Sequence, residues 1–169
     1  MRLERIKFSE YKKEITSLRQ LAWKERTKFP SENLIIQDKL DESDLSIHWG
    51  VFNDHELIAS CRVSILSTIE QLPYKDIFKD LDLLFSHNFA FYSRLVIHPD
   101  YRKKGLAKEL DEIRVNELKN QNVKLALATA RDWRLNYLIG EGWKMVKPVE
   151  EEYVEKYSIG NTTIICFEL

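Results

Sequence analysis

Hydrophobic and polar residues follow two different periods along this chain, and these periods divide it into helical and strand-like segments. Apolar residues three or four positions apart predict helices at 9–28, 68–86, 105–120 and 131–140. Alternating or continuous apolar runs predict strands at 45–53, 56–66, 89–98, 123–130, 143–148 and 161–169. The polar, acidic stretch 29–44 is expected to be a loop with one short turn.

The order of these segments predicts how the strands connect. Asn53 and Asp54 are turn residues that join two strand-like runs into an antiparallel hairpin. Residues 91–130 have the order strand, helix, strand and the size of a parallel crossover, and the run 123–130 is typical of a strand buried on both faces. We therefore expect an α/β (α+β) fold. A single domain over 1–169 would contain a mixed, mostly antiparallel sheet of six to seven strands and about four flanking helices.

Charge and cysteine content narrow the classes of function. The formal net charge of −1 gives no overall field that would attract nucleic acid or an anionic membrane. No run approaches membrane-spanning length, and the N-terminal residues have no apolar stretch like that of a secretory signal. Cys61 and Cys166 lie in apolar strand-like runs, where two buried thiols fit a reducing cytoplasm. No spacing typical of metal ligands is present, so no metal is expected.

The stretch from Phe91 to Ala107, FYSRLVIHPDYRKKGLA, carries the most chemical information. It has the pattern of a strand, a proline-bounded turn and a basic, glycine-containing start of a helix. Backbone N–H groups and the positive end of the helix dipole meet at this turn, which suits a ligand that carries a pyrophosphate. The alternative interpretation is a solvated basic turn that binds nothing.

Arg102, Gly105 and Ala107 in this turn, followed later by the pair Gly142–Trp143, give the chain a resemblance to the GCN5-related N-acetyltransferase (GNAT) superfamily. The family signature is Arg or Gln, two residues, Gly, one residue, then Gly or Ala. Here it stands between an LVIHP strand end and an amphipathic helix. The order of elements is similar over nearly the whole chain. The resemblance implies an enzyme that moves an acetyl or other acyl group from acyl-CoA to an amine by direct attack.

The resemblance also implies where acetyl-CoA, or another acyl-CoA, would bind. The N–H groups from Lys103 to Ala107 would hold the diphosphate, and glycine at 105 would allow a close approach. The preceding strand would carry a bulge and splay from its neighbour. The pantetheine arm would then pair with that strand, and an N–H at the bulge would polarise the thioester carbonyl. The expected cofactor-binding residues are Leu95, Val96, Ile97, Arg102, Lys103, Lys104, Gly105, Leu106 and Ala107.

Several residues are candidates for proton transfer. The family often has a tyrosine at the position of Leu138 to protonate the departing thiolate. Here its neighbour Tyr137 is the candidate acid, or else a tyrosine of the core. A general base needs hydrogen-bond reach of the acceptor. Histidine as a residue type titrates in the useful range. The candidates are His48 on the first hairpin strand, His87 before the central strand and His98 at its end, although each could equally be structural.

Arg62 and Arg94 each interrupt an apolar strand, so each is expected to have an acidic partner. Asp41 or Asp44, in the acidic loop before the hairpin, is the nearest choice. Alternatively, Arg62, Arg94 and Asp44 bind the acceptor, with an arginine holding its carboxylate.

Three functions fit these features. The first is acetyl transfer from acetyl-CoA to a small-molecule or peptide amine. The second resembles acyl-homoserine-lactone synthases or N-acyl-amino-acid synthases and uses a longer acyl donor, sometimes on acyl carrier protein. The third is a non-catalytic CoA-binding regulatory module.

The features that favour the second function are Trp23, the Asp41/Asp44 pair, Arg62 and Ser93-Arg94. Phe91 stands where that family has a glutamate and counts against the second function, and the intact RKKGLA turn favours CoA as the donor. A monomer or a homodimer is expected, the latter paired through the C-terminal strand.

Overall fold

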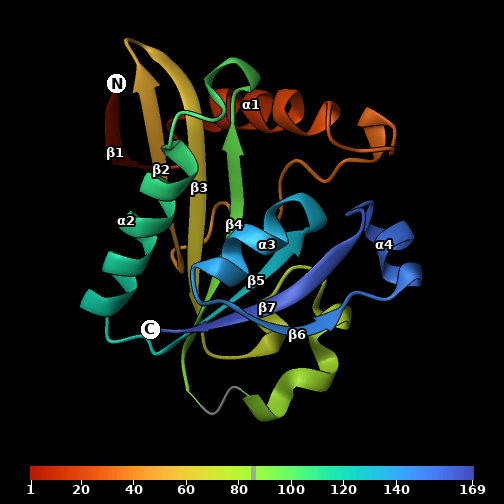
Figure 1. The fold of residues 1–169 in the computed structure, drawn as a ribbon. Coiled ribbons are helices and arrows are strands. Elements are labelled where there is room, and N and C mark those ends of the chain that lie inside the picture. Colours follow the sequence, from red (N-terminus) through yellow and green to blue (C-terminus); the bar gives the residue numbers. More distant parts are fainter. Residues whose placement is uncertain (85–86) are drawn as a thin grey trace.

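A seven-stranded sheet with the order β1-β2-β3-β4-β5-β7-β6 runs through the centre of the molecule (Figure 1). The structure is a computed structural model that describes residues 1–84 and 87–169. The strands are β1 (Arg2–Ile6), β2 (Ser46–Asn53), β3 (Glu56–Leu66), β4 (Phe89–Ile97), β5 (Leu125–Arg131), β6 (Lys144–Pro148) and β7 (Thr162–Glu168). The α-helices are α1 (Lys12–Lys24), α2 (Leu106–Asn120), α3 (Asp132–Gly140) and α4 (Glu151–Tyr157). The 3-10 helices are η1 (Ser31–Asn33), η2 (Ile69–Gln71), η3 (Lys75–Leu84) and η4 (Pro99–Tyr101).

One pair of neighbouring strands is parallel and the others are antiparallel. The parallel pair is β4 and β5, and α2 is the helix that connects them. A parallel connection needs a crossover of this kind, because the chain must return to the same end of the sheet. The expected mixed sheet with one parallel βαβ unit and four flanking helices is confirmed.

Both faces of the sheet are covered. Side chains alternate along β4, so Ala90 and Tyr92 face one side and Phe89 and Phe91 the other. The first pair belongs to a core with α2 and α3, which lie in front of the sheet in Figure 1. The second pair belongs to a core with η3 and α4, and α1 closes a third apolar cluster against the strands. This two-sided cover places the β4–β5 junction at the middle of the molecule.

Strand β1 and helix α4 were not expected from the sequence, and the segment 68–86 forms a different type of helix from the one expected. Strand β1 buries only Ile6 below one-tenth exposure, and α4 only Val154, so neither has a strong hydrophobic pattern. The segment 68–86 was expected as one helix, but the described part forms η2 and η3. Over so few turns, periods of 3.0 and 3.6 residues give nearly the same apolar spacing, so the sequence does not separate them.

The C-terminal strand has no free edge. Strand β7 pairs with β5 on one side and β6 on the other, so it leaves no free edge for the expected pairing with a second copy. Cys61 is buried as expected, whereas Cys166 is only half-buried, and both thiols are free. Within the described ranges, no helix combines the length and the apolar character needed to cross a bilayer.

Candidate active site

The two parallel strands separate after a short paired region. They pair from Ala90 with Ala126 to Tyr92 with Ala128, and no pairing follows. The register between β3 and β4 also shifts opposite Cys61, which marks a bulge in β4. Arg94, at the bulge, has a φ of +58°. An extra residue on one strand bends it and increases its twist, so β4 turns away from β5. The splay that the resemblance implied is therefore present.

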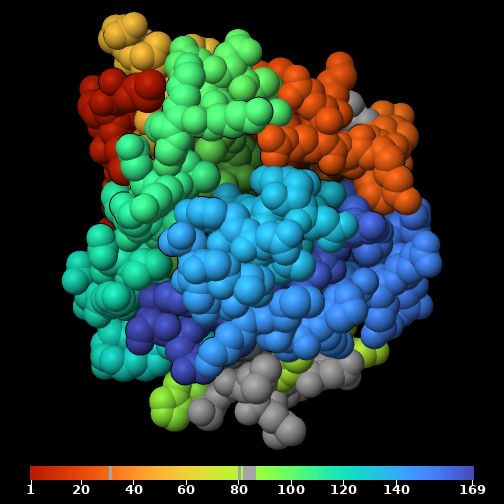
Figure 2. Space-filling model, in the orientation of Figure 1, coloured from red at the N-terminus to blue at the C-terminus, as the bar shows by residue number. Residues whose placement is uncertain are grey.

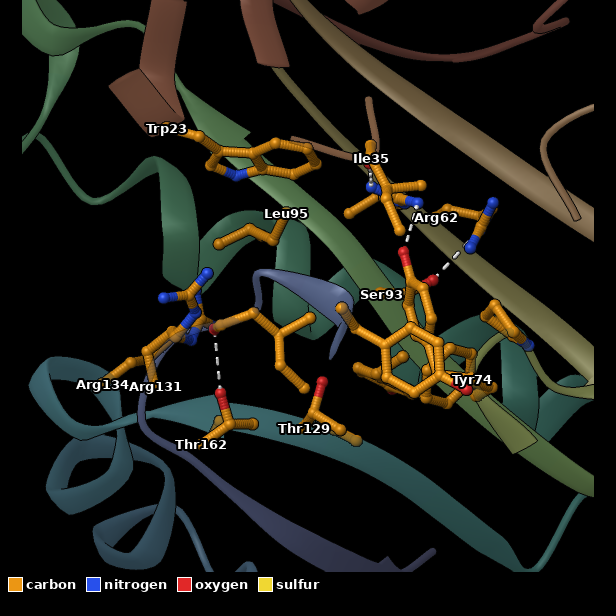
Figure 3. A pocket seen from close by; sticks show the side chains of 18 of the residues that line it. Trp23, Ile35, Arg62, Tyr74, Ser93, Leu95, Thr129, Arg131, Arg134 and Thr162 are labelled. Atoms are coloured by element: carbon orange, nitrogen blue, oxygen red, sulfur yellow. Dashed lines mark hydrogen bonds between the residues drawn. The ribbon is translucent and has the colours of Figure 1, made fainter. Parts of the chain in front are cut away.

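A cavity of about 220 Å³ lies between the separated ends of β4 and β5 (Figure 3). Its walls come from both faces of the sheet. On the α2/α3 side they include Tyr92, Arg114 and Leu138, and on the other side Tyr74 and Phe91. In the space-filling view, a hollow lies between α1, the turn that leads from β4 to α2, and α3 (Figure 2). The cavity thus lies where the strand ends, the loop after α1 and the start of α3 meet.

The turn between β4 and α2 leaves a set of backbone donors unused. Gly105 precedes the helix with a φ of +85°, and Lys103 has a φ of +62°. The N–H groups of residues 108 and 109 donate to the Gly105 carbonyl, whereas those of 103–107 have no backbone acceptor in the described part of the chain. A β-carbon at Gly105 would meet no atom within 4 Å, so the space in front of these donors is open. Lys103 and Lys104 are exposed beside it.

The other residues expected to bind the cofactor do not all lie at the same site. Arg102 does not face the open space, because its guanidinium donates to the Glu25 carboxylate and the Ala22 carbonyl at the end of α1. Leu95 lines the cavity. Val96 is buried against the α1 cluster, and Ile97 is half-buried and pairs with β3. Of these expected residues, only Leu95 has its side chain in the cavity wall.

A buried network of three arginines and two aspartates adjoins the bulge. Asp41 accepts two hydrogen bonds from Arg19 and one from Arg62, each at 2.8 Å. Asp38 accepts from both nitrogens at the end of Arg62, and it also pairs with Arg94. The expected ion pair of Arg62 with Asp41 is thereby found, but Arg94 pairs with Asp38, which the sequence did not single out. Asp44 is exposed and lies outside both the network and the cavity wall.

Hydrogen bonds to the network and its neighbours use most of the N–H donors of Arg62 and Arg94. The Nε of Arg62 donates to the Ser93 hydroxyl at 3.0 Å (Figure 3). Arg94 also donates to the Ile35 carbonyl and to the Tyr74 hydroxyl. Burial alone would raise the pKa values of Asp38 and Asp41, but the hydrogen bonds and charges of the arginines hold both below the usual range. Arg62 and Arg94 therefore hold the bulge to the loop at 35–41, with four hydrogen bonds each. Their binding of an acceptor carboxylate stays a prediction.

The candidate histidines do not line the cavity. His48 is buried, and its Nε2 lies 3.1 Å from the Asp41 carbonyl oxygen. His87 is exposed before β4. His98 is half-buried, and its Nδ1 accepts from the Asp100 N–H. The structure brings none of these rings to the splay.

His48 is expected to make the folded protein sensitive to mild acid. Burial, and then the charge of Arg62, lower the pKa of His48 to about 4, whereas an unfolded histidine titrates near 6.5. The unfolded chain therefore binds a proton first, so stability is lost as pH falls from 6.5 towards 4, by up to about 3 kcal/mol. Urea unfolding at two pH values within that window should show a smaller loss for His48→Gln than for the native chain. An undiminished loss in His48→Gln would contradict the assignment.

Tyr137 is not a core residue. Its side chain is 40% exposed, and it does not contribute to the cavity wall. The neighbouring Leu138 is buried and does line the cavity. The single-residue offset therefore turns Tyr137 away from the splay, as the 100° step of a helix requires. The position at which the family often has a proton donor is apolar in this chain.

A second ionic cluster lies on the α2/α3 side, and sequence inspection missed it. Asp111 on α2 pairs with Arg114 on the same helix and with Arg134 on α3, so the pair with Arg134 links the two helices. Arg114 is buried and donates to the Arg62 carbonyl through its Nη1. Arg114 lies four residues from both Leu110 and Leu118 on the buried face of α2, and this spacing could have indicated a buried arginine from the sequence.

The cavity wall is strongly cationic. It contains six arginines and two aspartates, although the whole chain has a formal net charge of −1. The arginines are Arg26, Arg62, Arg94, Arg114, Arg131 and Arg134. A partly enclosed site with excess positive charge attracts anionic ligands. Within residues 1–84 and 87–169, no three His, Cys, Asp or Glu side chains are grouped to hold a metal ion.

A protein family described as N-acyl amino acid synthase FeeM matches residues 14–132 of the chain. No protein of curated function matches the sequence.

Solved structures similar to this one include that of FeeM, an N-acyl amino acid synthase from uncultured soil microbes. Its TM-score is 0.76 at 9% identity, over 99% of this chain and 91% of the other. The PaiA N-acetyltransferase of Thermoplasma acidophilum, in complex with coenzyme A, has a TM-score of 0.67 at 15% identity over the whole of both chains. Tetrahymena GCN5 has a TM-score of 0.62 at 14% identity, over 99% and 96%. At such identities these likenesses establish a common fold.

Proposed function

Since the chain belongs to the N-acyl amino acid synthase FeeM family, we propose that it joins the acyl group of a thioester to the amine of an amino acid. The expectation of an N-acyltransferase with the GNAT fold is confirmed by the family and by the shared fold. The amino acid as acceptor, and the chemical form of the donor, are our proposal.

The observation that carries this proposal is the cationic cavity within the β4–β5 splay. Beyond Tyr92 and Ala128 the two strands no longer pair, so a ligand strand has backbone groups to bind on their facing edges. The cavity wall continues from the α2/α3 side to the side of Tyr74 and Phe91. Donor and acceptor can therefore meet at the sheet, and holding them together supplies much of the rate of a direct attack.

For the donor we propose acyl-CoA, with its diphosphate at the turn before α2. The free N–H groups of residues 103–107, the open space at Gly105 and the exposed Lys103 and Lys104 support this position. The similar PaiA structure is a complex with coenzyme A. A thioester on a carrier protein lacks the nucleotide and would leave these groups unused.

For the acceptor we propose an amino acid whose carboxylate binds Arg131, the last residue of β5. Arg131 lines the cavity, is half-buried and has no carboxylate within ion-pair distance among the described residues. Its guanidinium lies against Gly160, where a β-carbon would come within 2.0 Å of Nη1. Arg26, by contrast, is exposed and stacks on Trp133. A half-buried cation without a partner suits an anionic ligand group.

Release of free thiol tests the function directly. The protein would be incubated with acyl-CoA donors from two to twelve carbons and with a panel of amino acids, and mass spectrometry would detect the N-acyl product. We expect thiol release that depends on an amino acid. Acetyl transfer to simple amines or peptides instead would favour the acetyltransferase. A preference for longer acyl chains would favour the synthase-like reaction. CoA binding without any thiol release would support a regulatory module and contradict catalysis.

Arg131→Met should weaken the use of amino acids selectively. Loss of a charge-assisted hydrogen bond to the carboxylate is worth about 1.5–3 kcal/mol, so KM for the amino acid should rise roughly 10- to 100-fold. The same variant should use the corresponding amine without a carboxylate as well as the native enzyme does. Steady-state kinetics with the two acceptors measures this difference. An equal loss with both acceptors would argue against carboxylate binding by Arg131.

A further inference from the structure

Tyr92 is placed at the point where the paired strands end. It is the last residue of β4 that pairs with β5, opposite Ala128, and it faces α2 and α3. Its ring packs edge-on against Trp143 at 5.2 Å between centroids, and the Arg114 guanidinium lies over it at 4.3 Å. These contacts fix the ring in the wall of the cavity.

The Tyr92 hydroxyl has no hydrogen-bond partner in the described part of the chain, although the residue is only 5% exposed. A buried polar group without a partner costs about 1–3 kcal/mol, and native proteins retain few of them. The hydroxyl belongs to a cavity-lining residue, so a ligand in the cavity is a natural partner for it.

The hydroxyl is suited to donate rather than to accept a proton. Burial raises the pKa of Tyr92 above its usual value, although the charge of Arg114 opposes this change. The phenol therefore carries its proton at neutral pH, and what it lacks is an acceptor. Arg114 beside the ring would stabilise the phenolate once that proton has left.

We propose that Tyr92 is the catalytic acid, whose hydroxyl donates its proton to the sulfur of the departing thiol. This inference rests on the proposed acyl transfer. The amine nitrogen forms a bond to the thioester carbon, the carbon–sulfur bond breaks, and its electron pair stays on sulfur. Sulfur takes the Tyr92 proton and leaves as the thiol. The phenolate regains a proton as the new amide nitrogen loses one, through water. Tyr92 thus provides from β4 the donor that Leu138 cannot provide from α3.

Tyr92→Phe tests this role through the nature of the leaving group. General acid catalysis typically contributes 10²–10⁴-fold, so kcat with an alkyl thioester should fall by about 100-fold or more. An aryl thiol is far more acidic and leaves without a proton, so its ester should react nearly as fast with the variant as with the native enzyme. The probes are acetyl esters of N-acetylcysteamine and of 4-nitrothiophenol, compared at the same saturating amino acid.

The controls separate this role from a structural one and from failure of the proposed function. Tyr92→Phe removes an unsatisfied hydroxyl, so its unfolding temperature should equal or exceed the native value. Tyr11 lies outside the cavity wall, so Tyr11→Phe should leave the rates with the alkyl and the aryl thioester unchanged. Equal losses with the two esters, or unchanged turnover with the alkyl ester, would overturn the role of Tyr92. If the native enzyme releases no thiol from any donor, the proposed function itself fails.

Discussion

Replacing Asp41 with alanine is expected to lower the free energy of unfolding by about 3–5 kcal/mol. Asp41 is the only carboxylate that Arg19 contacts among the described residues, and both side chains are at most 1% exposed. Removing it leaves the Arg19 charge buried without a partner and takes one of the two carboxylates from Arg62. An uncompensated charge in a low-dielectric interior is far more costly than the loss of a surface ion pair.

The matched control is Asp44→Ala, which removes the same group from an exposed position three residues further on. It should change the free energy of unfolding by less than about 0.5 kcal/mol. Urea unfolding of the two variants at neutral pH measures both values. Similar stabilities for the two variants would show that the network does not hold the loop at 38–41 to the sheet.

Gly105→Glu is expected to weaken CoA binding at least 100-fold while the protein stays folded. A side chain here projects into open space, so no atom of the protein is displaced, and the left-handed backbone costs roughly 1 kcal/mol. The new carboxylate would lie in front of the N–H groups of residues 103–107. It would accept their hydrogen bonds itself and repel the diphosphate.

Calorimetric titration with CoA measures the loss, and Gly140→Glu provides the comparison. Gly140 also has open space around it, and it is the last residue of α3, far along the chain from the turn. That variant should bind CoA with native affinity. Native affinity in Gly105→Glu would place the nucleotide elsewhere and remove the support for a CoA donor.

The elements that the sequence predicted are those whose pattern is local. The hairpin at 45–66, the crossover at 91–130 and the turn at Gly105 each depend on residues close together in the chain, and the structure contains all three. Strand β1 lacks such a pattern, because its charged residues outnumber its apolar ones and its partner β2 begins 40 residues after β1 ends.

The site residues that the sequence did not single out become visible only through packing. Asp38 stands in a polar loop, and nothing in its neighbourhood distinguishes it from Asp44. The structure shows that two strand arginines pair with it. Tyr92 resembles any aromatic residue of a strand until the end of the β4–β5 pairing and the missing partner of its hydroxyl are both known.

The excess of arginine in the cavity wall has a consequence for the release of product as well as for the capture of substrate. A spent nucleotide donor keeps all its phosphates, and an acylated amino acid keeps its carboxylate, so the same charges that draw substrates in also retain what remains. Mobile ions weaken such attraction, most of all at the wetter margin of the site. Ionic strength should therefore set a compromise between slow departure in dilute buffer and poor capture in concentrated salt.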